Sequence, residues 1–330
     1  MARVSGVRMM PAGPSPFRVE ARSLPAAKFV DPVRTAAGEA RAMVPLVGLE
    51  TLWFNTGTLC NLACANCYIE STPTNDALVY LTAGEVARFI DEIARNRRGT
   101  REIGFTGGEP FMNPDIIAML ELALERGHAV LVLTNAMKPM RRRETALLAL
   151  LARYHERLTL RVSLDHHSQA IHEAERGPGS WAVALDGLRW LSAGGFRVSV
   201  AGRHLAREHE ADVRAGYAAL FAAQGIPVDA SDPAGLVLFP EMDAAADVPE
   251  ITTACWGILD RSPASVMCAG SRMVVHRRGE AAARVVACTL IPHHRDFDLG
   301  ATLAEAAGPV ALNHPHCARF CVLGGASCSG

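Results

Sequence analysis

The feature that most constrains this sequence is a regular alternation of short, β-rich apolar runs with longer segments of helical periodicity, from about residue 50 to residue 240. Alternating strand and helix patterns are typical of repeated βα units around a parallel sheet. Six units are too few for a closed eight-stranded barrel, so the sequence predicts an α/β fold with an open, partial (β/α)6 TIM-like barrel. The six predicted strands are residues 51–55, 102–105, 129–133, 158–163, 197–200 and 236–239.

Several helices carry recognisable end signals. Thr82 and Glu85 have the spacing of a capping box, directly before residues that are apolar at helical intervals. The next helix is expected to begin after Asp115 and to end at Gly127, because glycine commonly follows the last turn of a helix. Further helices are expected at residues 141–154, 181–193 and 209–224.

Size and charge limit the classes of function. A length of 330 residues allows one large catalytic domain with a smaller appendage. The formal net charge of -1 gives no electrostatic reason to expect nucleic acid or an anionic membrane as a partner. No apolar run approaches the roughly 18 residues that cross a bilayer, and no signal peptide is recognised, so a cytoplasmic location without a membrane anchor is expected.

The chain is expected to divide into three segments. Residues 1–45, rich in Ala, Arg and Pro, are predicted to be a partly ordered leader lying over the surface. Residues 46–245 hold the βα units. Residues 246–330 are irregular and rich in Cys, His, Gly and Pro, and they have too few core residues to fold without support such as a metal cluster.

The nine cysteines are unevenly distributed, since three lie between residues 60 and 67 and six between residues 255 and 328. In a reducing cytoplasm, clustered cysteines are more often metal ligands than disulfides. The odd total also argues against a fully paired disulfide framework. Both groups are therefore candidate metal sites.

The first group has the spacing Cys-x3-Cys-x2-Cys on a loop after the first predicted strand, and consists of Cys60, Cys64 and Cys67. Three thiolates can bind three irons of a 4Fe-4S cluster and leave the fourth iron open to another ligand. A structural zinc site takes four protein ligands, and no fourth is near in the sequence, although a His or Cys could come from elsewhere. Spacing alone favours the cluster and leaves zinc open.

Two runs resemble motifs of the radical S-adenosylmethionine (radical SAM) superfamily. Residues 59–68, which hold the three cysteines, are similar to the superfamily's cluster loop. Residues 105–110, with Gly107, Gly108 and Glu109, are similar to its glycine-glycine-glutamate-proline motif and follow the second predicted strand. On these two motifs, which occur in the expected order, the chain is identified as a member of this superfamily.

The resemblance implies that S-adenosylmethionine binds the open iron and is cleaved reductively, and that the resulting 5'-deoxyadenosyl radical abstracts hydrogen from a substrate. It implies an electron donor such as flavodoxin or ferredoxin. Gly107 and Gly108 would let the backbone approach the cofactor, and Glu109 would accept a hydrogen bond from its ammonium group. Further cofactor contacts implied by the resemblance are Tyr68, Asn135, Ser163 and Asp165.

Each of these further contacts has a structural alternative. Tyr68 could instead pack in the core, and the Asn, Ser and Asp side chains are also common in turns and caps. Arg176 and Gly177 resemble an Arg-Gly element of several relatives, with a surface salt bridge as an equal alternative for the arginine. His166 and His167, just beyond the fourth strand, are candidates to face the substrate.

The second cysteine group resembles the auxiliary-cluster domains called twitch and SPASM. The likeness rests on a Cys-Ala-Gly run, a glycine turn, an Asp-Leu-Gly run and a closing Cys-x3-Cys pair. One auxiliary cluster is favoured over two, because Cys255 and Cys328 could complete a second only with help, or could replace one of the four ligands. The four ligands that the resemblance implies are Cys268, Cys288, Cys317 and Cys321.

The leading hypothesis is an enzyme that starts a radical reaction on a small-molecule or peptide substrate. One alternative is a peptide-modifying enzyme of natural-product maturation that relies on a separate recognition protein. Another is a non-catalytic iron-sulfur electron carrier, although a carrier has no need of a motif that seats S-adenosylmethionine. A zinc-binding interaction module is the third, and the visible absorption of a reconstituted iron-sulfur cluster would exclude it.

Overall fold

The computed structural model describes residues 11, 13–18, 21–96, 99–240 and 242–325. Nine strands form one sheet in the order β10-β9-β8-β2-β3-β4-β5-β6-β7. In chain order they are β2 (Thr51–Asn55), β3 (Glu102–Thr106), β4 (Ala129–Thr134), β5 (Leu158–Ser163), β6 (Arg197–Arg203), β7 (Leu236–Phe239), β8 (Ser271–Val275), β9 (Arg284–Val286) and β10 (Asp298–Gly300). Strands β2 to β7 are all parallel, which confirms the six predicted strands and the open, partial barrel.

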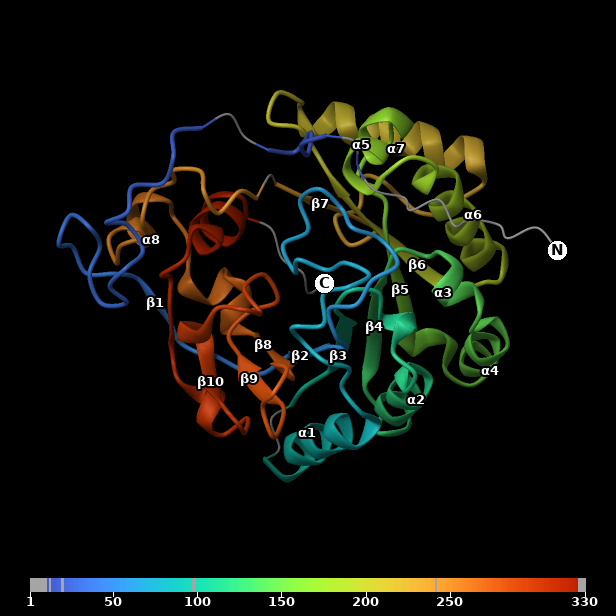
Figure 1. Ribbon diagram of the computed structural model, residues 1–330, viewed down its shortest axis with the longest axis horizontal. Helices are drawn as coiled ribbons and strands as arrows, with labels where there is room; N and C mark the ends of the chain where they lie inside the picture. The colour runs from blue at the N-terminus through green and yellow to red at the C-terminus, as the bar shows by residue number, and fades with distance from the viewer. Residues whose placement is uncertain (1–10, 12, 19–20, 97–98, 241, 326–330) are drawn as a thin grey trace.

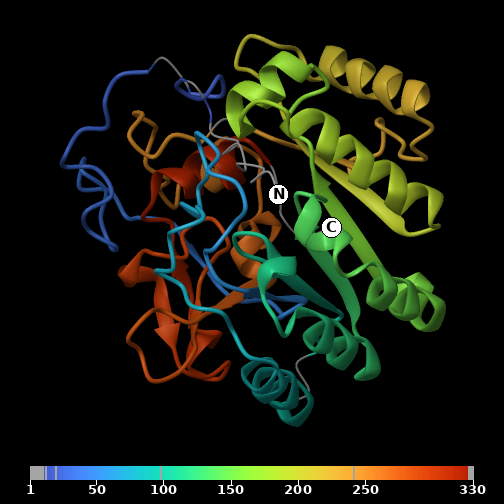
Figure 2. The same cartoon turned by 45° about the vertical axis from the view of Figure 1, so that its right-hand side comes forward.

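Helices cover the outer side of this sheet, as Figures 1 and 2 show for α1, α2, α4, α6 and α7, which follow one another around it. Every residue of β2 is buried, as expected where both faces of a parallel sheet are covered. The helices are α1 (Ala83–Asn96), α2 (Ile116–Glu125), α3 (Lys138–Arg141), α4 (Glu144–Tyr154), α5 (Gln169–Arg176), α6 (Ser180–Ala193), α7 (Glu210–Gln224) and α8 (Cys255–Ile258).

The helix ends follow local chemistry. The capping box is confirmed, because the Glu85 carboxylate accepts from the backbone N–H of Thr82 (2.9 Å) and the Thr82 hydroxyl accepts from that of Glu85 (3.2 Å). Helix α5 was not predicted, since it has only eight residues and buries polar side chains, His172 and Glu175, in place of an apolar stripe. This short helix proves important for the site.

The cysteine-rich part of the chain continues the barrel sheet. Strand β8 pairs parallel with β2, and β9 and β10 add antiparallel strands beyond it, to the left of β2 in Figure 1. Segments on either side of residue 245 therefore share one sheet, and the division of the chain there stays a prediction.

The N-terminal segment is held at several points. Phe17 is fully buried, and the buried guanidinium of Arg203 lies over its ring at 5.3 Å. Arg41 forms a buried ion pair with Glu250, and β1 (Met43–Val44) pairs with β11 (Val310–Ala311). The predicted leader thus contacts both the barrel and the cysteine-rich part, while residues 1–10, 12, 19 and 20 lie outside the described residues. Within the described part of the chain, no helix has the length and apolarity needed to cross a membrane.

Candidate active site

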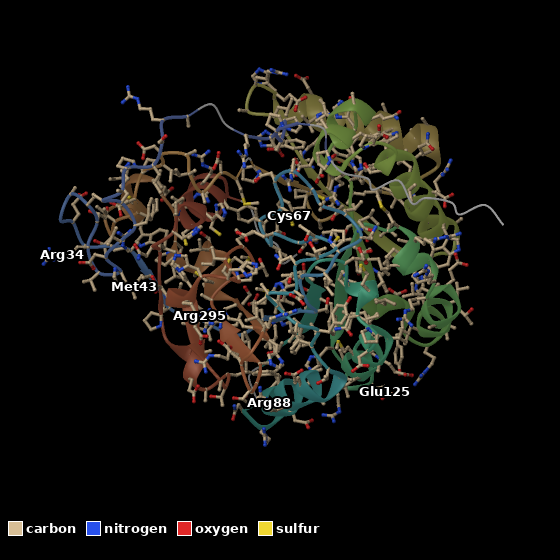
Figure 3. All side chains as sticks on the ribbon, in the orientation of Figure 1. Arg34, Met43, Cys67, Arg88, Glu125 and Arg295 are labelled. Carbon is tan, nitrogen blue, oxygen red and sulfur yellow. The ribbon has the colours of Figure 1, made fainter. Side chains whose placement is uncertain are left out.

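The cysteine loop leaves the C-terminal end of β2 and forms one wall of a cavity of about 810 Å³. The other walls come from residues at or beyond the ends of β3 to β7, the edge at which parallel α/β folds gather their chemistry. Figure 3 labels Cys67, which lies near the middle of the molecule. The predicted site residues in these walls are Cys60, Cys64, Cys67, Tyr68, Gly107, Gly108, Asn135, Ser163 and Asp165.

The two glycines let the turn after β3 lie against the cysteine loop. Gly107 has a φ of +143°, and a Cβ atom there would lie 2.6 Å from the carbonyl oxygen of Gly57. A Cβ atom on Gly108 would overlap the backbone carbonyl of Leu59. Backbone hydrogen bonds join the two segments at the same point, from Gly108 N to Gly57 O (2.7 Å) and from Glu109 N to Leu59 O (3.1 Å). The glycines therefore fix the position of the loop.

Glu109 lies behind the cavity wall and does not line it. Its carboxylate accepts from the Thr134 hydroxyl and from the backbone N–H of Asn135, both at 2.8 Å, and from that of Phe111 at 3.2 Å. Burial raises the pKa of Glu109 to about 7, against the lowering effect of these hydrogen bonds. Glu109 ties the end of β3 to the end of β4, and its contact with the cofactor ammonium stays a prediction.

Asn135 connects the end of β4 to the cysteine loop. Its side-chain amide donates to Asn61 Oδ1 (2.9 Å) and lies 3.9 Å from Cys60 Sγ, while its oxygen accepts from Met137 N (3.1 Å). Asn135 therefore contacts the first cysteine as well as lining the cavity.

A buried network of charges closes the other end of the site. The Arg176 guanidinium binds both oxygens of Asp165, from Nε at 2.5 Å and from Nη2 at 3.1 Å, and Arg203 Nε lies 3.5 Å from the same carboxylate. Of the two alternatives for Arg176, the surface salt bridge is therefore wrong, because the arginine does form a salt bridge but its side chain is only 12% exposed. Burial alone would raise the pKa of Asp165, but Arg176 and Arg203 hold that pKa well below its usual range.

Glu175 is a residue of the site that sequence reasoning missed. Its carboxylate accepts from the backbone N–H of Asn66 (2.9 Å) and from the Ser15 hydroxyl (2.5 Å), and lies 3.6 Å from Arg203 Nη1. Its backbone carbonyl accepts from Ala65 N (2.8 Å). Glu175 thus holds the part of the loop between Cys64 and Cys67, and the one signal for it was its place beside Arg176 in the Arg-Gly element.

His166 and His167 do not line the cavity. His166 is buried, with Nε2 bonded to Glu208 (3.1 Å) and Nδ1 accepting from Ser168 N (2.9 Å). His167 packs against Tyr217. The structure thus gives both histidines partners behind the strand end, and their proposed position facing the substrate is not supported.

The thiols of the loop suit an iron-sulfur cluster. Burial raises the pKa of Cys60 well above its usual range and that of Cys64 to about 12, although Arg176 acts in the opposite direction on Cys64. Such thiols stay protonated until a metal takes the place of the proton. Among the residues that the structure describes, no three His, Cys, Asp or Glu side chains lie close enough together to bind a single metal ion. A cluster takes one thiolate per iron, so three thiols along one cavity wall fit it.

The four predicted auxiliary ligands line one smaller cavity of about 370 Å³, which has an apolar surface, and they are Cys268, Cys288, Cys317 and Cys321. Burial raises the pKa of Cys268 to about 11. Cys255 lies outside this cavity, where its sulfur accepts from Thr252 N (3.4 Å), and Cys328 lies outside the described residues. The structure pairs none of the eight cysteines that it describes into a disulfide.

The fold and the site together define a class of protein. Its members have an open α/β barrel, with a three-cysteine loop and a glycine turn at the C-terminal ends of the first two barrel strands. Residues 54–214 match the family model described as "Radical SAM superfamily". Residues 54–214 of the chain therefore form a radical SAM domain.

Two curated relatives each match about two fifths of this chain. The chain is 35% identical over 143 residues to the "Antilisterial bacteriocin subtilosin biosynthesis protein AlbA" of Bacillus subtilis (strain 168), which covers 43% of this chain and 30% of that protein. It is 30% identical over 137 residues to "Mycofactocin maturase MftC" of Mycobacterium tuberculosis (strain ATCC 25618 / H37Rv), which covers 42% of this chain and 33% of that protein. Each match thus spans about a third of the relative.

Solved structures with bound S-adenosylmethionine have the same fold. Streptococcus suis SuiB bound to S-adenosylmethionine matches with a TM-score of 0.56 at 12% identity, over 77% of this chain and 64% of that chain. Native anSMEcpe with bound AdoMet matches with a TM-score of 0.55 at 13% identity, over 77% of this chain and 79% of that chain. At these identities the likeness shows the fold alone.

Proposed function

We propose that this chain is an enzyme that binds a 4Fe-4S cluster through Cys60, Cys64 and Cys67 and cleaves S-adenosylmethionine beside it. The observation that carries this proposal is the convergence of three buried or half-buried thiols, the glycine turn and polar strand-end residues on one cavity. When bound, the cluster and S-adenosylmethionine supply a 5'-deoxyadenosyl radical that removes hydrogen from a C-H bond of the substrate.

The protein residues position and shield these groups. Asn135 and Glu175 hold the two ends of the cysteine loop, through Asn61 and Asn66 respectively. Tyr68, Ser163 and Asp165, with Gly107, Gly108 and Asn135, line the space available to S-adenosylmethionine. Because Asp165 already binds Arg176, any cofactor hydroxyl would share this carboxylate with a cation. The side chains of Asp165 and Arg176 are themselves shielded from water, with exposures of 4% and 12%, which strengthens their ion pair.

The second cavity supports one auxiliary 4Fe-4S cluster with ligands from Cys268, Cys288, Cys317 and Cys321. These four residues come from three separate parts of the chain and still share one lining. The other residues that line this cavity are aliphatic, apart from His316, so the four sulfurs and the His316 imidazole are the metal ligands that the lining offers. Clustered cysteines that suit metal ligation are typical of a reducing compartment, and we place the protein in the cytoplasm.

A peptide is the substrate class that we favour. The two curated relatives are named for bacteriocin biosynthesis and for mycofactocin maturation. An open groove of about 1000 Å³ also runs outside the cysteine loop and is lined by Cys64, Cys67, Tyr68 and Asp243. It shares three of these residues with the main cavity, and His316 with the auxiliary cavity. A groove that extends from the cysteine loop to His316, in the lining of the auxiliary cavity, suits an extended substrate better than a small molecule.

The experiment is anaerobic reconstitution of the full chain, followed by dithionite and S-adenosylmethionine, with iron counted and 5'-deoxyadenosine measured. The wild-type protein is expected to form 5'-deoxyadenosine, and a Cys60→Ala, Cys64→Ala, Cys67→Ala variant is not. Equal product from both proteins, or none from the wild type, refutes the proposal. About eight irons per chain are expected for two clusters, and about four would remove the auxiliary cluster from the proposal.

A further inference from the structure

A second groove opens on a different side of the cysteine loop. It has a volume of about 1000 Å³ and shares no lining residue with the 810 Å³ cavity. Asn61, Phe111 and Met112 form one part of it, and the start of α3 with the turn that follows forms the other. The residues that line this basic groove are Asn61, Phe111, Met112, Lys138, Pro139, Arg142 and Arg143.

All charged side chains in that lining are cations, namely Lys138, Arg142 and Arg143. Within the described residues, no ion pair is recorded for these three side chains. Their neighbour Arg141 differs, because it binds Glu144 (2.8 Å) and lies over the ring of Trp190 (4.6 Å). Three positive charges in one groove are a local excess of positive charge, because the net charge of the whole chain is -1.

The basic groove lies next to a cysteine of the loop. Asn61, in its lining, directly follows Cys60 in the sequence and is hydrogen-bonded to Asn135, whose amide lies 3.9 Å from Cys60 Sγ. Phe111 is buried beneath the groove, and its backbone N–H donates to Glu109. A partner in this groove would reach the vicinity of Cys60 without entering the cavity that holds the cofactor.

We propose that the basic groove docks a small acidic protein that carries single electrons at low potential, of the flavodoxin or ferredoxin class. This inference rests on the proposed function, because the electron is needed by a cluster at Cys60, Cys64 and Cys67. The carrier loses one electron and the cluster gains one, with no group transferred. A cationic rim steers an acidic partner and raises its association rate, and an apolar floor formed by Phe111 and Met112 fits a small, transient interface.

The first test compares two reductants on the anaerobically reconstituted full chain. Reduced flavodoxin and dithionite are each mixed with the protein in a stopped-flow instrument, and the rate of loss of cluster absorbance is measured. A Lys138→Glu, Arg142→Glu, Arg143→Glu variant should be reduced by flavodoxin at least about tenfold more slowly at low salt. Its rate with dithionite should be unchanged. The matched control is Arg95→Glu, an exposed arginine on α1, which should behave as wild type.

The chain itself provides a second test, because it contains only two lysines, Lys28 and Lys138. Lys28 is paired with Asp247, and residues 21–45, which include Lys28, are drawn in blue at the left of Figure 1, while α3 lies at the right. A zero-length carbodiimide cross-link between wild-type protein and flavodoxin should form at Lys138 and not at Lys28, as mapped by mass spectrometry. This test needs no variant that could disturb the fold.

Equal flavodoxin rates for wild type and the triple variant, or cross-links at Lys28 in place of Lys138, overturn the docking proposal. If dithionite also reduces the variant slowly, the substitutions have disturbed the cluster and the rate comparison does not report docking. The position of the cross-link on wild-type protein then decides the docking proposal. Failure of the proposed function is seen separately, since it would appear as absent 5'-deoxyadenosine in the dithionite reaction, which needs no docking partner.

Discussion

Replacement of Asp165 by asparagine tests the buried charge network beside the cysteine loop. The Asp165 side chain is 4% exposed and lies between the guanidinium groups of Arg176 and Arg203. Asparagine keeps the shape of the side chain but removes the charge that compensates two buried cations. Loss of one partner of a buried ion pair costs about 3–5 kcal/mol of unfolding free energy.

The expected shift in melting temperature follows from the length of the chain. An unfolding entropy of about 2.1 cal/mol/K per residue gives about 0.7 kcal/mol/K for this protein. Asp165→Asn should therefore lower Tm by about 4–7 °C. The assay is scanning calorimetry of anaerobically reconstituted wild type and variant at one scan rate.

The control is Glu121→Gln, which breaks the exposed ion pair of Glu121 with Arg153. An exposed pair contributes about 1 kcal/mol or less, so this Tm should fall by no more than about 1–2 °C. Because the pKa of Asp165 is lowered in the folded state, its contribution is complete above its unfolded pKa and is lost only as the pH falls through the folded value. The Tm difference should thus be constant between pH 6 and 8. Equal shifts for both variants would refute the reasoning.

Three further predictions follow from the same structure. Gly108→Ala should prevent normal iron incorporation, because its Cβ atom would overlap the carbonyl of Leu59, whereas Gly257→Ala, which meets no atom within 4 Å, should bind iron as wild type does. Glu109 has a raised pKa of about 7, so its ionisation should lower wild-type stability as the pH rises from 5 to 8. A Glu109→Gln variant should not lose stability over this pH range, as measured by denaturant unfolding at each pH. If the free energies of unfolding of wild type and variant change in parallel with pH, the prediction is contradicted. Cys268→Ala should reduce iron content by up to about four per chain while 5'-deoxyadenosine formation by dithionite persists; unchanged iron would argue against the auxiliary cluster.

Local patterns were sufficient to predict much of the barrel. The strands from β2 to β7 are apolar runs that pack on both faces, so their positions follow from composition and from the helices between them. The capping box at Thr82 and Glu85 and the lining of the main cavity are also local, since strand ends in a parallel sheet meet at one edge.

Features that depend on distant contacts could not be read from the sequence in this way. Glu175 gains its role only when α5 brings it to the backbone of Asn66 and to Ser15, residues 109 and 160 positions away. The pairing of β8 with β2 likewise joins segments far apart in the chain. A surface salt bridge was one of two equal alternatives for Arg176 because arginine is usually exposed, but a bidentate partner at Asp165 allows its burial.

The most direct test of the account is the electron paramagnetic resonance spectrum of the dithionite-reduced protein before and after addition of S-adenosylmethionine. If Cys60, Cys64 and Cys67 hold a cluster with an open iron, the cofactor binds that iron and the spectrum of the reduced cluster changes. A Cys60→Ala variant should show no such change. A wild-type spectrum that stays the same with saturating S-adenosylmethionine would contradict the central claim.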